Sequence, residues 1–251
     1  GSSPSSEFTL QSFTMSGGGM VGVQETYRSV LKDMELESAD DFWIGLEVEG
    51  SSQVDVLDSY FHGQLNMTGS GLSDAIHVVA NNSAEIDINI ERTTINQVTH
   101  GIVLRYGGSG TGNINALIRN TTITGIGTPT TYSVGSGFDY GNSAAGIVAY
   151  GGGSGGSIGT VNYTTINNTY SSKVPNNNAT AIFEAIDGDG QVSHTAQNDL
   201  YAIGNGSTSE NYRRYSGSGS PTFTTASNGG NVSSDSTLST LFTKTTDKHN
   251  L

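Results

Sequence analysis

Apolar and polar residues alternate with a period of two along the middle of this chain. In residues 86–90 and 114–118 every second residue is Ile or Ala. This is the period of a β-strand with one buried face. Only residues 21–37 and 237–244 have a spacing that suits a helical turn or two, and we expect the second to form a small amphipathic cap. The pattern predicts an all-β protein.

A six-residue pattern recurs through these segments. With one exception it is apolar at positions one and six, and position four is mostly Ser, Thr or Asn. Near copies occupy 90–95, 118–123 and 161–166, and looser copies occupy 31–36, 56–61 and 195–200. A second apolar element follows each of the first five hexads, starting at Ile44, Ile76, Ile102, Ile147 and Ile182. Two series that advance together predict stacked coils, with an internal Ser/Thr/Asn ladder at position four.

At these hexads and at the Gly-Ile-Val strands the chain resembles the right-handed parallel β-helix proteins, the pectin lyase-like superfamily. The resemblance covers roughly residues 30–204. It implies an all-β, right-handed parallel β-helix solenoid of about six rungs with loop insertions on one face. Residues 1–29 would form an N-terminal opening rung or cap, and residues 205–251 a tail that packs back or is partly disordered. The competing interpretation is a β-sandwich of about fifteen short strands.

Composition supports a repetitive, exported protein. Gly, Ser, Thr and Asn make up nearly half of the chain, and in stacked coils they serve as ladder and bend residues. The absence of cysteine excludes disulfides, thiolate metal sites and a Cys nucleophile. A net charge of −13 with ten cations argues against nucleic acid or anionic lipid as partner, and no apolar run reaches the ~18–20 residues of a membrane span. We expect an extracellular or cell-surface location.

Three rungs carry extra residues at the same point of the coil. The two apolar elements are 12 residues apart in the rung that starts at Ile90, but 20, 29 and 21 apart in those that start at Val56, Ile118 and Val161. Insertions at one phase of a solenoid emerge on one face. The inserted segments 62–73, 124–144 and 167–180 mix aromatic and small polar residues, a combination that suits sugars. We expect the ligand-binding residues there: His62, Tyr132, Phe138, Asp139, Tyr140 and Tyr170. Alternatively, these aromatic rings pack beneath their own loops.

Residues able to catalyse a reaction are sparse. Polysaccharide lyases and hydrolases of the β-helix class use clustered carboxylates with a basic residue nearby. Asp40, Asp41 and the Thr99-His100-Gly101 segment match the hydrolase pattern only in part, so we name no catalytic residue. Glu184, Asp187 and Asp189 could form a calcium loop, because oxygen ligands on alternating residues with Gly at the turn suit Ca²⁺. A plain Asp/Gly turn is the competing interpretation, and no other cofactor is expected.

A strip of side chains should share the outward face of the second-element strands. It contains His77, Val103, Val148 and Phe183. The strip is either an exposed contact surface or a face covered by the protein's own loop or tail.

The function predicted from these features is non-enzymatic: an adhesin-like surface module that binds polysaccharide or cell-surface glycan. The first alternative is a polysaccharide lyase or glycoside hydrolase, including a tailspike-like depolymerase. The second is a structural stalk or fibre segment.

The charge is unevenly distributed along the chain. Of the 23 acidic residues, 15 precede Arg92, and the negative charge is therefore concentrated in roughly the first third of the chain.

Overall fold

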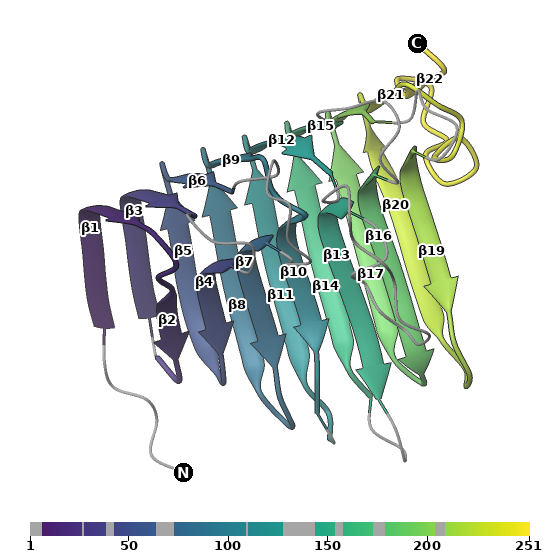
Figure 1. Cartoon of the computed structure of the whole chain (residues 1–251). Coiled ribbons are helices and arrows are strands. Elements are labelled where there is room, and N and C mark those ends of the chain that lie inside the picture. The colour runs from purple at the N-terminus through teal and green to yellow at the C-terminus, as the bar shows by residue number, and fades with distance from the viewer. Residues whose placement is uncertain are drawn as a thin grey trace.

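The computed structural model describes residues 7–26, 28–38, 43–63, 73–108, 110–127, 144–153, 158–172, 179–203 and 209–251. All regular structure in these ranges is β, arranged in two sheets (Figure 1). Every strand pair is parallel. Parallel pairing throughout is not that of a β-sandwich, whose sheets are antiparallel. None of the described residues belongs to a helix that could cross a bilayer.

The larger sheet consists of two ladders that meet at β3. The ladder of long strands contains β3 (Arg28–Glu37), β5 (Ser52–Leu57), β8 (Glu85–Glu91), β11 (Asn113–Arg119), β14 (Thr160–Ile166), β17 (Gln191–Gln197) and β20 (Thr222–Gly229). The ladder of short strands continues from β3 through β6 (Tyr60–His62), β9 (Thr94–Asn96), β12 (Thr122–Ile126), β15 (Thr169–Ser172), β18 (Leu200–Ala202), β21 (Val232–Ser233) and β22 (Lys248–His249). β1 (Glu7–Ser16) also pairs with β3.

The smaller sheet has seven strands. They are β2 (Val21–Gln24), β4 (Trp43–Glu49), β7 (Ser73–Ala80), β10 (His100–Tyr106), β13 (Ala144–Gly153), β16 (Ala179–Gly188) and β19 (Glu210–Ser216). From β4 to β18, each strand pairs with the strand three places later in the chain. The chain therefore returns repeatedly to the same three positions, and like residues stack above like.

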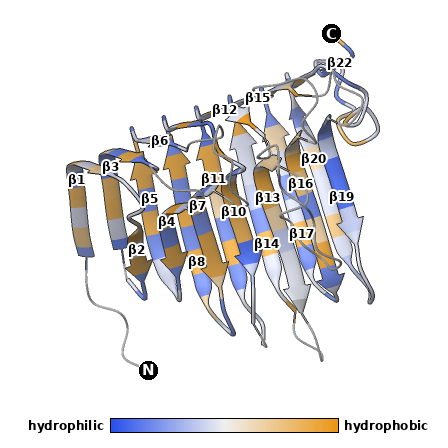
Figure 2. Ribbon diagram, viewed as in Figure 1, coloured by the Kyte–Doolittle hydropathy of each residue, from blue (hydrophilic) through white to orange (hydrophobic). Residues whose placement is uncertain are grey.

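The strand register confirms most of the predicted hexad alignment. Position one runs through Leu31, Val56, Ile90 and Ile118, which are directly paired. Position six runs in the same way from β3 to β12. These side chains are fully buried between the sheets, and apolar and polar bands alternate along the strands in Figure 2. The period-two pattern thus found the core.

Three predicted alignments are wrong by a few residues. Val161 pairs with Ile114 rather than Ile118, so the hexad at 161–166 is displaced by four positions. The hexad at 195–200 is displaced by one, because Thr165, the partner of Ile118, pairs with Ala196. In the second series Leu46, not Ile44, pairs with Ile76. The shared Thr-Thr-Ile sequence suggests the wrong alignment, because polar residues recur at several neighbouring positions around these bends.

The bends between long and short strands explain position four. Position three adopts a left-handed backbone with φ between 51 and 56° in each case: Asp33, Asp58, Arg92, Asn120, Asn167 and Asn198. This conformation is most accessible to Gly, Asn and Asp. The next side chain then accepts a hydrogen bond from the preceding coil: Asn168 Oδ1 from the Thr121 amide at 2.8 Å, and Asp199 Oδ1 from the Asn168 amide at 2.7 Å. The predicted internal polar ladder is present.

Both ends of the chain extend the sheets. Residues 21–37 contain β2 and all of β3, so the helical spacing there is misleading. Residues 209–251 add β19 to β22, which carries both sheets past the predicted core limit of residue 204. The segment 237–244 forms a turn closed by the Phe242 amide and the Leu238 carbonyl at 2.8 Å. Leu238 and Phe242 are buried against the end of the core.

Candidate functional site

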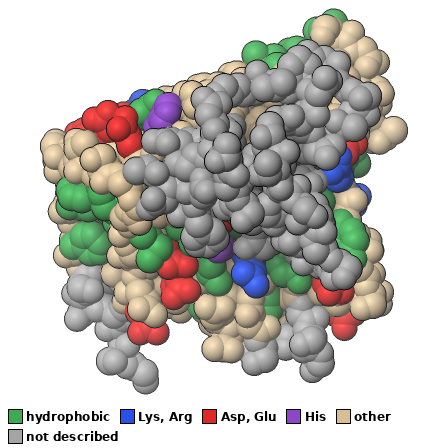
Figure 3. Space-filling model, viewed as in Figure 1, with side chains coloured by type: hydrophobic (Ala, Val, Ile, Leu, Met, Phe, Trp, Pro, Cys, Tyr) green, Lys and Arg blue, Asp and Glu red, His purple; other side chains and the backbone are tan. Residues whose placement is uncertain are grey.

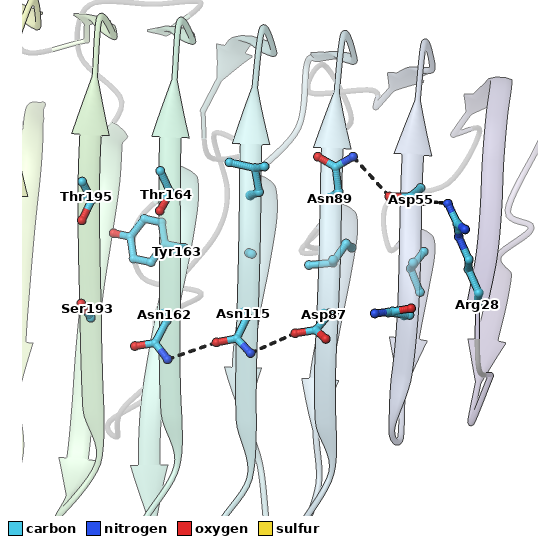
Figure 4. Close-up of a pocket in the computed structure, with 15 residues that line it drawn as sticks. Arg28, Asp55, Asp87, Asn89, Asn115, Asn162, Tyr163, Thr164, Ser193 and Thr195 are labelled. Carbon is cyan, nitrogen blue, oxygen red and sulfur yellow. Dashed lines mark hydrogen bonds and ion pairs between the residues drawn. The ribbon is translucent and has the colours of Figure 1, made fainter. Parts of the chain in front are cut away.

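An open groove crosses the outward face of the larger sheet, from β5 to β17 (Figure 4). Its volume is about 680 Å³. Two rows of outward side chains line it. The first row is Gln53, Asp87, Asn115, Asn162 and Ser193, and the second is Asp55, Asn89, Leu117, Thr164 and Thr195. Alternate residues on a strand lie ~7 Å apart, so the rows form the walls of a channel across the strands.

Hydrogen bonds link neighbouring members of each row. Asn162 Nδ2 donates to Asn115 Oδ1 at 3.2 Å, and Asn115 Nδ2 donates to Asp87 Oδ1 at 2.9 Å. In the second row Asn89 Nδ2 donates to Asp55 Oδ1 at 3.2 Å. Arg28, at the end of that row, approaches the other oxygen of Asp55 at 3.5 Å. The amides of Asn162, Asn115 and Asn89 thus each use a donor within the wall, while a carboxylate oxygen can accept more than one hydrogen bond and so can also accept from a ligand.

The central part of the outward face of the smaller sheet is buried. Val103, Val148 and Phe183 lie in register beside His77, with exposed fractions of 0, 0, 7 and 7%. Of the two interpretations of this strip, the covered face is correct. On the side of the molecule seen in Figure 3, acidic side chains lie over the N-terminal strands and also at the C-terminal end of the sheets.

A small charged cluster lies on the N-terminal part of that buried face. His100 Nδ1 and Asp74 Oδ1 are 2.7 Å apart, and His77 Nδ1 lies 3.8 Å from the other Asp74 oxygen. Neither ring nitrogen of His77 has a hydrogen-bond partner, and burial lowers the pKa of His77. Beside it in the register is Glu47, whose pKa is raised by burial and by Glu49. His100 is fully buried, so it does not present the exposed imidazole that the hydrolase pattern requires; Asp40 and Asp41 lie outside the described residues.

A second polar cluster occupies the C-terminal part of the interior. The buried carboxylate of Glu184 accepts hydrogen bonds from the hydroxyls of Tyr163 and Tyr212 at 2.8 and 2.5 Å. Arg214 reaches it at 3.3 Å. His194 stacks on Tyr163 with ring centroids 4.2 Å apart, and burial lowers the pKa of His194 to about 3. Burial raises the pKa of Glu184, and its inward position gives this cluster a structural part.

The predicted loop residues are only partly within the described structure. Tyr132, Phe138, Asp139 and Tyr140 lie outside it. Tyr170 is in β15, fully buried and stacked on Tyr201 at 5.1 Å. Its ring therefore belongs to the core and offers no face to a ligand. His62 is half-buried at the end of β6, where its Nδ1 lies 2.8 Å from the Tyr60 hydroxyl.

The predicted calcium loop does not assemble. Glu184 points inward from β16, while Asp189 is exposed at the following turn and accepts a hydrogen bond from the Ser220 amide at 2.9 Å. Asp187 lies beside Ser218, with 3.5 Å between Oδ1 and the hydroxyl. Within the described ranges, no three His, Asp or Glu side chains are placed to hold a metal ion. The plain Asp/Gly turn is the better description.

The groove itself was missed at the sequence level, although its signal was present. The polar residues that alternate with Ile in 86–90 and Asn115 among the apolar residues of 114–118 are the wall residues. The period-two pattern by itself identifies them only as the solvent side of a strand. Comparisons of the chain with family models, with curated proteins and with solved structures found no match. Function is therefore inferred from the side chains of the groove.

Proposed function

We propose that the chain is an extracellular, non-enzymatic glycan-binding module, adhesin-like in its role, that holds a polysaccharide or surface glycan in the groove of the larger sheet. The observation that carries this assignment is the pair of polar rows that runs along the groove over five strands. Binding sites fix their ligands through a few well-placed hydrogen-bonding groups. Here such groups repeat at the strand spacing, as a polymer of hydroxyl-bearing units requires.

The chain path that we propose is a right-handed parallel β-helix. Pairing between strands three places apart supports a coil, and parallel crossover connections are right-handed in about 98% of cases. The seven strands of the smaller sheet would then mark seven turns rather than six. In each of the three inserted segments the long connection falls between a short strand and the next strand of the smaller sheet, namely between β6 and β7, β12 and β13, and β15 and β16. This common position in the chain supports insertion at one phase of the coil.

An extended ligand suits the groove better than a single sugar. From β5 to β17 the groove crosses four strand spacings, or ~19 Å. No aromatic face supports a sugar ring there, because Tyr163 is buried and its hydroxyl donates to Glu184. Each hydrogen bond contributes only ~0.5–1.5 kcal/mol. Useful affinity therefore requires several contacts along a chain.

The test is a pulldown on insoluble polysaccharides with reducing ends measured in the same tubes. Wild-type protein should be retained on the polysaccharide without the release of reducing ends. Asn115→Trp, which fills the middle of the groove, should reduce retention at least tenfold, and Thr222→Trp on the exposed part of β20 should not. Retention that Asn115→Trp leaves unchanged would place the binding site elsewhere. Absence of both retention and release would favour the stalk.

A glycoside hydrolase is the second candidate, and one observation favours it. Asp55 and Asp87 stand on opposite rows of the groove and on neighbouring strands. Two residues along a strand and one strand spacing place their Cα atoms ~8 Å apart. Both side chains project from the same face, so this spacing is compatible with the ~6.5–9.5 Å carboxylate separation of inverting enzymes. Release of reducing ends that disappears in Asp87→Asn would establish this activity in place of simple binding.

A further inference from the structure

The groove presents an excess of hydrogen-bond acceptors to a ligand. Both amide hydrogens of Asn162 are directed at oxygens of its neighbours, Asn113 and Asn115, each at 3.2 Å. The amides of Asn115 and Asn89 donate to the carboxylates of Asp87 and Asp55. Several of the wall's amide hydrogens are therefore used within the wall. A ligand that brings donors of its own can bind to the acceptors that remain.

One acceptor in the groove has no partner at all. Asn89 Oδ1 is a buried oxygen without a hydrogen bond, next to Asp55 in the second row. A buried acceptor that stays unsatisfied costs ~1–3 kcal/mol. It lies on the same stretch of β5 and β8 that holds both groove carboxylates. This end of the groove thus combines two negatively charged side chains with an acceptor that has no hydrogen-bond donor.

Charge restricts the ligand further. Among the described residues, Arg28 is the one cation that lines the groove, and its guanidinium faces Asp55. The whole chain carries −13. Uronate or sulfate groups would be repelled by Asp55 and Asp87 and would find no unpaired cation beside them, whereas an ammonium group would be attracted.

We infer that the glycan held in the groove carries free amino groups, as a polymer of deacetylated amino sugars does. This inference rests on the proposed glycan-binding function and names its substrate class. Ammonium groups would lie at the β5–β8 end, between Asp55 and Asp87 and next to Asn89. Sugar hydroxyls would meet the neutral part of the walls at Asn162, Thr164 and Ser193, since hydroxyls both donate and accept.

The experiment is isothermal titration with three oligomers of matched length: a chitosan oligomer with free amines, its N-acetylated counterpart and an oligogalacturonate. The pH is set so that the amines are protonated. We expect at least tenfold tighter binding of the amine oligomer than of the N-acetylated one, equivalent to 1.4 kcal/mol, and no binding of the uronate. The preference should weaken at high salt.

Variants decide where the preference arises. Asp55→Asn and Asp87→Asn keep the size of the side chain and should each reduce the preference at least threefold. Asp189→Asn removes an exposed charge outside the groove and should leave the preference intact. Unfolding midpoints measured on the same samples show whether each variant is folded.

The outcomes separate this inference from the function on which it rests. Equal binding of the amine and N-acetylated oligomers would overturn the amine preference and leave glycan binding standing. If the preference persists in both Asp55→Asn and Asp87→Asn, it arises from a general attraction of the amines to the acidic protein. That result would also overturn the inference that the groove selects amines. Failure of all three oligomers, together with no retention on any polysaccharide, would remove the proposed function itself.

Discussion

The outward faces of the two sheets are built by the same alternation of side chains but have opposite surroundings. On the larger sheet most of the outward residues along the groove are Asn, Asp, Ser or Thr, and Asp87 and Asn115 are exposed there. On the smaller sheet they include Val103, Val148 and Phe183, which are almost completely buried. Strand geometry alone does not distinguish the faces, because both show period two. The outward face of the larger sheet is the solvent-exposed one, and its side chains can exchange their hydrogen bonds with water for hydrogen bonds with a ligand.

The largest effect should come from placing one charge on each face. Val148→Asp puts a carboxylate into a fully buried apolar cluster, where an unpaired charge costs several kcal/mol. We expect a loss of at least ~3 kcal/mol in the free energy of unfolding, or failure to fold. Thr164→Asp, on the groove wall, should change it by no more than ~0.5 kcal/mol. Urea unfolding monitored by circular dichroism measures both, and equal losses would mean that the faces do not differ.

A second pair of substitutions compares the inside and the outside of one bend series. Asn168 is buried, accepts from the Thr121 amide and donates to the Ile118 carbonyl at 2.9 Å. Asn168→Ala leaves both backbone groups without a partner and should cost ~1–3 kcal/mol. Asn120 lies at an exposed bend position, and Asn120→Ala should cost less, mainly through its left-handed backbone. A larger loss for Asn120→Ala in urea unfolding would contradict the internal ladder.

His77 provides a test by pH. Burial lowers its pKa below the ordinary value near 6.5, so the unfolded chain takes up the proton first as the pH falls. Its effect on stability is therefore absent above pH ~6.5 and destabilising below it. His77→Leu should be neutral or stabilising at pH 7.5 and should reduce the loss of unfolding free energy between pH 7.5 and 5.5. His62→Leu, at a half-buried position, serves as the control, and an unchanged pH slope in His77→Leu would refute the prediction.

The smallest effect on stability should accompany an effect on binding. Asn162→Ala removes the donor to Asn115 on the groove wall, where water can replace it. We expect the free energy of unfolding to change by ~0.5 kcal/mol or less, while affinity for a glycan oligomer falls severalfold. A thermal melt and a titration on the same preparation check both quantities. Lost stability with unchanged affinity would assign Asn162 a structural part only.

Sequence patterning predicted the core well and the binding surface poorly. Period-two alternation identified β8 and β11, and repeated hexads placed Leu31, Val56, Ile90 and Ile118 in one stack, because burial of every second residue leaves a strong periodic signal. The predicted alignment of hexads is wrong where Thr and Asn repeat at several bend positions, as in the hexad that starts at Val161. An aromatic residue among polar residues is typical of a loop, and on that basis the sequence predicts that Tyr170 binds a ligand. Its ring is instead inside the core. A groove depends on which strands lie side by side, and that information is absent from any one segment.

The most direct test of the account uses the side-chain amide signals of the protein in solution. Gln53, Asn89, Asn115 and Asn162 line the groove, while Asn120, Asn167 and Asn198 form an exposed amide row at the bends. Both sets give NH₂ resonances in one ¹⁵N-edited spectrum. Titration with an amine-bearing sugar oligomer should shift the groove amides in a saturable manner and leave the bend amides in place. Saturable shifts of the bend amides with the groove amides unmoved would contradict the assignment of the larger sheet as the ligand-binding surface.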